Sequence, residues 1–168
     1  MHSKYSYEMI GKEDFLLKGT FQNIHQRPQW MKMSLNFGLL YYGRGKKKIL
    51  SSLICLESIC GQKAIMTSSK KANLLLQIRR GMIIGSKVTL RKDSLYFFLD
   101  RLRMFHVLQE NVSFLKKECF TFRIQNPFQF PELRQTSFSS LPPLDISCVI
   151  RSSNQKESHL FYTLFHLV

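Results

Sequence analysis

Cationic side chains, which can bind phosphate groups, are concentrated in one block of the sequence. Between Arg27 and Lys92 there are fourteen Lys and Arg residues and one acid, Glu57, so this block carries a net charge of +13. The whole 168-residue chain carries +14, which leaves almost no excess elsewhere. Surfaces that only keep a protein soluble usually mix both signs of charge. The block therefore predicts a polyanionic partner, a nucleic acid first and an anionic membrane surface second.

The residues that nucleic-acid enzymes use for catalysis are scarce. Gly38 and Gly43 have P-loop spacing, but Arg44 and Gly45 follow where Lys and Ser or Thr are needed. A metal-dependent nuclease needs clustered carboxylates, and the whole chain holds eleven acids. We predict no catalytic residues and no enzymatic activity. A nucleic-acid-processing enzyme that uses the same basic face is the alternative.

The thiols and imidazoles do not have the spacing of metal ligands. The four cysteines include no C-x-x-C pair, and the five histidines are scattered. Structural zinc sites need paired ligands a few residues apart on both arms. We therefore predict no metal and no cofactor, and four reduced thiols at Cys55, Cys60, Cys119 and Cys148.

Aromatic residues, glycines and a basic run occur together at residues 41–48. Tyr41 and Tyr42 precede two glycines and the run Lys46, Lys47 and Lys48. This composition suits base stacking combined with phosphate contact, and it equally suits a flexible surface loop. We expect a loop in either case.

Hydrophobic periodicity predicts the elements that position these side chains. Alternation over residues 30–37 predicts a strand with two faces: Met31, Met33, Leu35 and Phe37 on one, and Lys32, Ser34 and Asn36 on the other. Further strands are expected over residues 62–67, 86–91, 119–124 and 145–150. Helices are expected over residues 49–60, ended by Gly61, over residues 93–105, capped by Asp93, and from residue 154 onward. Leu74, Leu75 and Leu76 fit either the core or an apolar loop tip.

This order of elements predicts an α+β fold with one largely antiparallel sheet. Helices would pack on one face of the sheet and leave the other face free for RNA. That free face would carry Lys32, Asn36, Gln62, and Lys87 or Thr89.

Several segments resemble the ribosomal large-subunit protein five family of the bacterial and organellar type. They are GQKA at residues 61–64, KK at 70–71, RRGMIIGSKVTLR at 79–91, FLDRL at 98–102, FPEL at 130–133 and LDI at 144–146. Upstream, Asn23, Ile24 and Pro28 and the run LNFG at 35–38 are similar to the family pattern as well. The resemblance covers residues 23–168, which we expect to form a single RNA-binding domain after an N-terminal extension or helix at residues 1–22.

The resemblance implies a structural protein that binds 5S rRNA and large-subunit rRNA in the central protuberance and contacts P-site tRNA. It implies 5S rRNA contacts at Asn36, Gln62, Thr89 and Arg91, and the periodicity agrees for the first three. With the neighbouring cations, the expected RNA-binding set is Asn36, Gln62, Lys63, Thr89, Arg91, Lys32, Lys46, Lys47 and Lys48. The expected tRNA-facing loop carries Lys70, Lys71, Arg79 and Arg80.

The remaining implications concern partners and location. The family touches neighbouring central-protuberance proteins and small-subunit head protein thirteen, and we expect no membrane association. The chain departs from the family at residues 73–75, where Asn-Leu-Leu replaces Ala-Gly-Phe, at Ile83, and in a shortened region between Leu102 and Cys119. That trimming, with many Phe, Lys and Ser, favours a mitochondrial ribosome in the matrix, with another organelle or the bacterial cytoplasm as the alternative. No import peptide is visible, so we expect synthesis inside the organelle.

Overall fold

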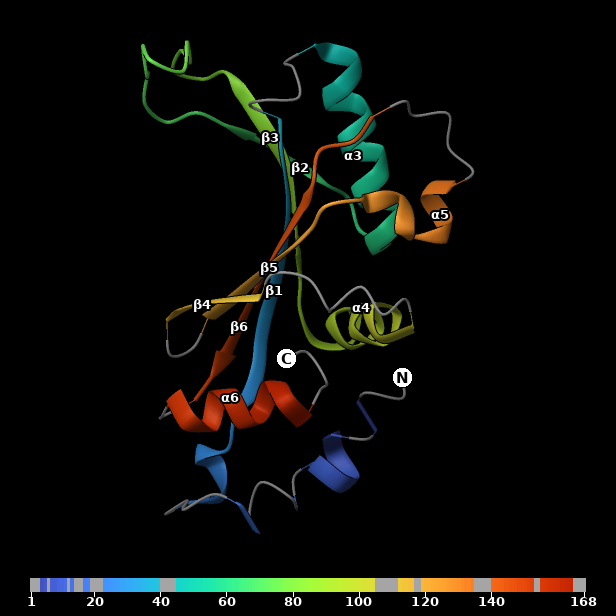
Figure 1. The fold of residues 1–168 in the computed structure, drawn as a ribbon, viewed down its shortest axis with the longest axis vertical. Helices are drawn as coiled ribbons and strands as arrows, with labels where there is room; N and C mark the ends of the chain where they lie inside the picture. Colours follow the sequence, from blue (N-terminus) through green and yellow to red (C-terminus); the bar gives the residue numbers. More distant parts are fainter. Residues whose placement is uncertain are drawn as a thin grey trace. The chain divides into compact units, whose positions relative to one another are not determined.

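The computed structural model describes residues 4–5, 7–11, 13, 17–18, 23–39, 45–104, 112–116, 119–134, 140–152 and 155–164 (Figure 1). The strands are β1 (Gln29–Gly38), β2 (Ile65–Ser68), β3 (Ile83–Leu90), β4 (Val112–Lys116), β5 (Cys119–Ile124) and β6 (Leu144–Arg151). The helices are α3 (Lys46–Cys60), α4 (Lys92–Met104), α5 (Pro131–Arg134) and α6 (Gln155–Leu164). Shorter turns are η1 (Tyr7–Gly11), η2 (Ile24–Gln26) and η4 (Pro127–Gln129).

The strands form one six-stranded sheet in the order β2-β3-β1-β6-β5-β4. β2 pairs with β3 and β4 pairs with β5, each time antiparallel. Helices and an antiparallel sheet in one chain confirm the predicted α+β class. β4 is a strand that the sequence pattern did not predict.

The chain forms two compact units. Unit 1 comprises Met1–Met33, Leu90–Phe122 and Ser147–Val168, and unit 2 comprises Ser34–Thr89 and Arg123–Ile146. The predicted boundary between residues 22 and 23 separates an N-terminal extension from a single domain. The division into two units does not test it, so it stays a prediction.

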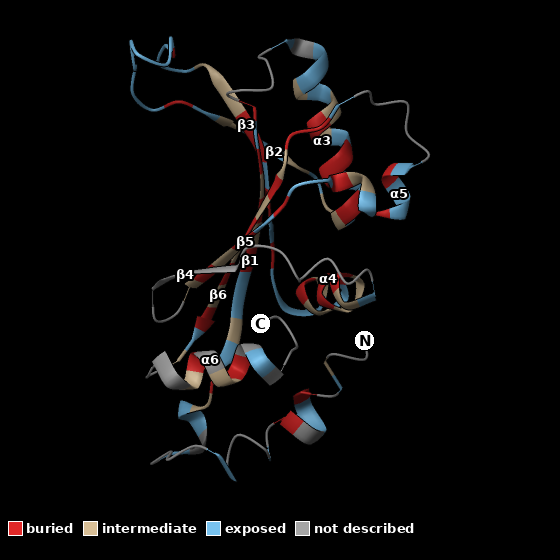
Figure 2. Ribbon diagram, in the orientation of Figure 1, coloured by how far each residue is buried: buried red, intermediate tan, exposed pale blue. Residues whose placement is uncertain are grey.

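The core of unit 2 lies between α3 and one face of the sheet. Leu35 and Phe37 of β1 are fully buried, and so are Cys55, Leu56 and Ile59 of α3. Ser52 of α3 accepts a hydrogen bond from Ser86 of β3 between their buried Oγ atoms, at 3.1 Å. A pair of small side chains lets the helix approach the strand closely. Figure 2 shows the resulting buried stripe along α3 in red.

The core of unit 1 combines a helical stripe with aromatic contacts. Leu95, Phe98, Leu99 and Leu102 of α4 are buried at helical spacing, within the helix that was predicted over residues 93–105. Phe161 of α6 makes edge-to-face contacts with Tyr7 and with Trp30, at ring-centroid distances of 5.7 and 5.1 Å. The Tyr7 hydroxyl donates to the Pro28 carbonyl at 2.6 Å, which ties the first turn of the chain to this cluster.

Three expected element boundaries were wrong. Helix α3 begins at Lys46, with Gly45 in an extended conformation as its N-cap, so residues 46–48 are helical and not loop. Strand β2 begins at Ile65, which leaves Gln62 in the turn that precedes it. Helix α4 begins at Lys92, so Asp93 lies inside its first turn, where its carboxylate accepts a hydrogen bond from Lys4 Nζ at 2.7 Å.

Two further details of the expected elements differ. Met31 is 53% exposed although it shares the parity of the buried Met33, because it lies near the beginning of β1. β3 ends at Leu90, so Arg91 follows the strand and does not belong to it. Residues 41–44 of the expected loop and residue 154, where the last helix was expected to begin, lie outside the described residues.

Gly85 should tolerate no side chain, because β1 approaches it closely. A Cβ atom at Gly85 would lie 2.3 Å from the Phe37 carbonyl oxygen and 3.1 Å from Thr67 Oγ1. We expect Gly85→Ala to lower the free energy of unfolding by about 1–3 kcal/mol, since one strand must shift. Gly38→Ala is the matched control, because a Cβ atom there meets nothing within 4 Å. Urea denaturation followed by circular dichroism would measure both, and equal stability of the two variants would contradict the close approach.

The cysteines should differ in reactivity according to burial. Burial raises the pKa of the Cys55 thiol to about 11 and raises the pKa of Cys148 well above its ordinary value. Since the thiolate is the nucleophile, both should react slowly with iodoacetamide at neutral pH, whereas Cys60 and Cys119 are half-buried and should react faster. Mass spectrometry of labelled peptides would measure the rates, and urea-unfolded protein is the control. Rapid labelling of Cys148 in the folded protein would contradict the burial.

Candidate nucleic-acid interface

The outward rows of β1 and β3 in unit 2 are polar. In β3, Ser86 and Val88 are buried while Lys87 and Thr89 are exposed. In β1, Asn36 is half-exposed between the fully buried Leu35 and Phe37. β1 and β3 are neighbours in the sheet, so these polar rows lie side by side.

A hollow of about 380 Å³ opens on this polar surface. We call it the polar hollow, and it is lined by Gln62, Lys63, Ile65, Thr67, Lys87, Val88 and Thr89. Ile65 is the cross-strand partner of Lys87 in the β2–β3 pair. The lining offers an amide, two hydroxyls and two ammonium groups, and no carboxylate. Hydroxyl and amide groups can bond ribose hydroxyls, and the ammonium groups can bind phosphates.

The turn between α3 and β2 positions Gln62 and Lys63. Gly61 ends α3 in the left-handed conformation, with φ 66°, and its N–H donates to the Glu57 carbonyl at 2.8 Å. The side chain of the same residue, Glu57, accepts a hydrogen bond from the Ala64 N–H, at 3.0 Å. The one acid of the basic block thus bonds both ends of this turn, Gly61 through its carbonyl and Ala64 through its carboxylate, and β2 begins at the next residue, Ile65.

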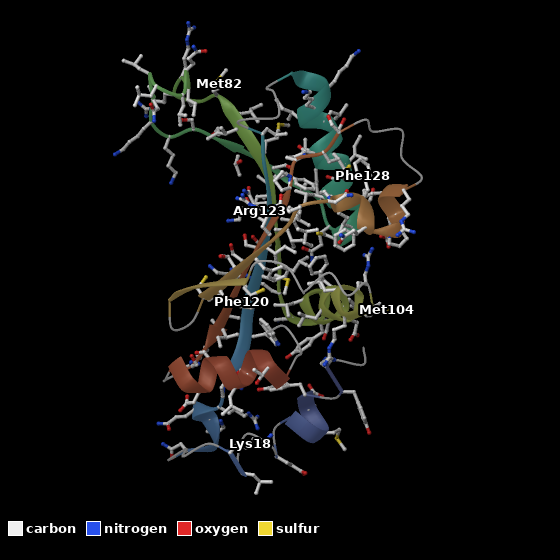
Figure 3. All side chains as sticks on the ribbon, in the orientation of Figure 1. Lys18, Met82, Met104, Phe120, Arg123 and Phe128 are labelled. Carbon is white, nitrogen blue, oxygen red and sulfur yellow. The ribbon has the colours of Figure 1, made fainter. Side chains whose placement is uncertain are left out.

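A long hairpin joins β2 to β3 and carries the expected tRNA-facing residues. We call Ser69–Met82 the basic hairpin, because it holds four cations and no acid. The Ser69 N–H donates to the Met82 carbonyl at 2.8 Å, and the Gly81 N–H donates to the Ser69 carbonyl at 2.9 Å. Lys70, Lys71, Arg79 and Arg80 are all exposed. Figure 2 shows this segment in pale blue over most of its length, and Figure 3 marks its base with Met82.

The structure brings some of the expected RNA-binding residues together. Gln62, Lys63 and Thr89 share the polar hollow, and Asn36 lies on the neighbouring strand. Lys47 and Lys48 are exposed in the first turn of α3, which Lys46 begins. Lys32 and Arg91 are exposed but belong to unit 1.

Lys87 and Thr67 line the polar hollow but are absent from the expected RNA-binding set. Lys87 and Thr89 were expected as alternatives, although residues two apart on a strand face the same side, so both belong to the surface. Thr67 was overlooked, and the same parity rule applied to β2 would have placed it beside Ile65.

The described part of the chain offers neither a metal site nor a membrane-spanning helix. No group of three or more His, Cys, Asp or Glu side chains there could hold a metal ion. Among the same residues, no helix is both long and apolar enough to span a bilayer.

Comparison with known proteins identifies the family. No protein-family model matches the chain. The large ribosomal subunit protein uL5c of Zygnema circumcarinatum is 39% identical over 146 residues, which are 82% of this chain and 79% of that protein. The uL5 of Prochlorococcus marinus strain MIT 9515 is 36% identical over 81% of this chain and 80% of its own length. The uL5c of Paulinella chromatophora is 32% identical over 94% of this chain and 92% of its own length.

These relatives define the class of the protein. It is a structural constituent of the large ribosomal subunit and not an enzyme, because its relatives are ribosomal proteins. The chain belongs to the large ribosomal subunit protein uL5 family. Its relatives come from plastids and bacteria, so its ribosome is that of an organelle or of a bacterial cytoplasm, and rRNA is its partner.

The turn that presents Gln62 should depend on the Glu57 carboxylate. Glu57→Ala removes the acceptor for the Ala64 N–H, and we expect that amide to exchange with deuterium about three- to tenfold faster, as the loss of one hydrogen bond implies. Glu57→Gln keeps a side-chain oxygen and should stay close to the unaltered protein. Hydrogen exchange read by NMR measures both variants. An unchanged Ala64 rate in Glu57→Ala would show that the side chain does not hold the turn.

Proposed function

We propose that the chain binds 5S rRNA through the polar hollow and the adjoining row of β1, and joins it to large-subunit rRNA in the central protuberance. The observation that supports this most is the polar hollow itself. Gln62 and Lys63 come from a turn and Thr89 comes from β3, 26 residues beyond Lys63, and the three line one open surface. Lys87 adds a further cation to it, and no acid is among the residues that line it.

The side-chain types fit double-stranded RNA better than DNA. A-form RNA presents a wide, shallow minor groove with ribose 2′-hydroxyls, which short side chains on a flat surface can reach. Thr67, Thr89 and Gln62 are of this kind. The cations around them supply the sequence-independent attraction to phosphates.

The basic hairpin is the part of the proposal that concerns tRNA. Its four exposed cations extend beyond the β2–β3 pair, where they would contact the phosphates of P-site tRNA. Contacts with neighbouring central-protuberance proteins and with small-subunit head protein thirteen belong to the same proposal. The shortened region between Leu102 and Cys119 lies largely outside the described residues.

The composition favours a mitochondrial ribosome, and this is the location that we propose. The plastid and cyanobacterial relatives make a plastid or bacterial ribosome the competing assignment. Co-sedimentation of the chain with large subunits from purified mitochondria, and its absence from those of plastids, would support the first location. The reverse distribution would contradict it.

The affinity for 5S rRNA should fall steeply with salt. About six to ten phosphate contacts would cost about 10³–10⁵ in affinity between about 50 and 200 mM salt. Filter binding of the full chain to a 5S rRNA transcript measures this dependence. An affinity that does not change with salt would contradict the electrostatic part of the proposal.

Removing the amide side chains should weaken 5S rRNA binding without unfolding the protein. We expect Asn36→Ala and Gln62→Ala each to lower the affinity about three- to tenfold, as one or two lost hydrogen bonds imply. Gln129→Ala, an exposed amide in η4, is the matched control and should bind normally. Circular dichroism would verify that all three variants are folded. Normal binding by both test variants would exclude these amides from the site.

A further inference from the structure

The end of the basic hairpin exposes two apolar side chains. Leu74 and Leu75, which we call the leucine tip, are each 94% exposed. Ile78 of the same hairpin is only 8% exposed, so the apolar packing of the hairpin involves Ile78 and not the leucine tip. Two adjacent, almost fully exposed leucines contribute nothing to the core, and they are available to a partner.

The leucine tip is held in place by its own turn. The Asn73 N–H donates to the Ile78 carbonyl and the Ile78 N–H donates to the Asn73 carbonyl, both at 2.9 Å. The Leu75 N–H donates to the Asn73 side-chain oxygen at 3.0 Å, and the Gln77 N–H donates to the Leu74 carbonyl at 3.1 Å. Gln77 has a φ of 52°, which closes the turn. Because the turn is already formed, binding through the tip requires little further ordering.

The charge of the hairpin selects the kind of partner. Lys70 and Lys71 precede the leucine tip, Arg79 and Arg80 follow it, and no acid lies between Ser69 and Met82. Because Asn73 pairs with Ile78, both pairs of cations lie on the stem below the tip, and a partner must offer anions next to an apolar surface. Folded RNA has this pattern, because ribose carbons and unstacked base faces lie between its phosphates. RNA is also the polyanion that surrounds a ribosomal protein.

We propose that the leucine tip packs against ribose and base faces of the RNA that the basic hairpin contacts. This packing adds a part to the binding free energy that does not depend on salt, beside the salt-dependent part that the cations supply. This inference rests on the proposed function, since it requires that the hairpin meet RNA. The two contributions are separable in principle. Cations act through counterion release, which depends on salt, whereas burial of apolar surface does not involve counterions.

The experiment compares two double variants of the full chain. Leu74→Ser with Leu75→Ser removes the apolar surface, and Lys70→Gln with Lys71→Gln removes two cations. Neither should unfold the protein, because all four side chains are exposed, and circular dichroism verifies this. The probe is fluorescein-labelled deacylated tRNA, and anisotropy gives the affinity between about 50 and 200 mM salt.

We expect the leucine variant to bind about tenfold more weakly at every salt concentration with the salt slope unchanged, as partial burial of two leucines implies. In the lysine variant, the slope of log affinity against log salt concentration should be smaller by about 1.5, because two phosphate contacts are lost. A leucine variant with normal affinity beside a weakened lysine variant would overturn the inference and leave the proposed function standing. Normal binding by both variants would overturn the tRNA contact itself. Binding to phosphatidylserine vesicles that tRNA does not displace, and that the leucine variant loses, would overturn RNA as the partner.

Discussion

The interface depends on the packing of α3 against one face of the sheet. Leu35 and Phe37 of β1 face the same core as Cys55, Leu56 and Ile59 of α3, and the Ser52–Ser86 hydrogen bond fixes the distance between helix and strand. Because side chains alternate along a strand, covering one row with a helix assigns the other row to the outside. The polar row of Asn36, Lys87 and Thr89 is thus a consequence of how the core is built.

The uncompensated charge of residues 27–92 gives the same surface its affinity for anions. In isolation, thirteen excess positive charges within 66 residues repel one another and disfavour a compact state. A polyanion removes that repulsion and releases its own counterions. The one acid, Glu57, offsets only one of the fourteen positive charges, and its side chain bonds the Ala64 N–H and holds a turn. Membership of the uL5 family agrees with this requirement, because rRNA supplies the anions.

Local sequence signals were sufficient where one element determined the outcome. Period-two alternation predicted β1, the apolar stripe predicted α4, and a glycine placed the end of α3 correctly. The expected boundaries were wrong where a side-chain hydrogen bond seven residues along the chain or a glycine N-cap sets them. The sequence around Gln62 is typical of a strand, but the hydrogen bond from Ala64 to Glu57 keeps these residues in a turn. The three lysines at 46–48 resembled a loop, although lysine is a good helix former and Gly45 provides the N-cap.

The candidate site was predictable in part for the same reason. Alternation along β1 and β3 was enough to place Asn36 and Thr89 on the outward face of the sheet. The same alternation places Lys87 there as well. The polar hollow was not predictable, because it requires the pairing of Ile65 with Lys87 and the turn that brings Lys63 beside them. The apolar tip at Leu74 and Leu75 could not be distinguished from core by hydrophobicity alone, and only the hairpin geometry shows its exposure.

The most direct test of the central claim is site-specific crosslinking in assembled large subunits. A photoreactive amino acid in place of Thr89 lies on the polar face, and one in place of Ser58 lies on the exposed side of α3. We predict that the Thr89 position crosslinks to 5S rRNA and that the Ser58 position does not. Crosslinks to 5S rRNA from Ser58 alone would contradict the account, because the RNA would then lie against the helices and not against the sheet.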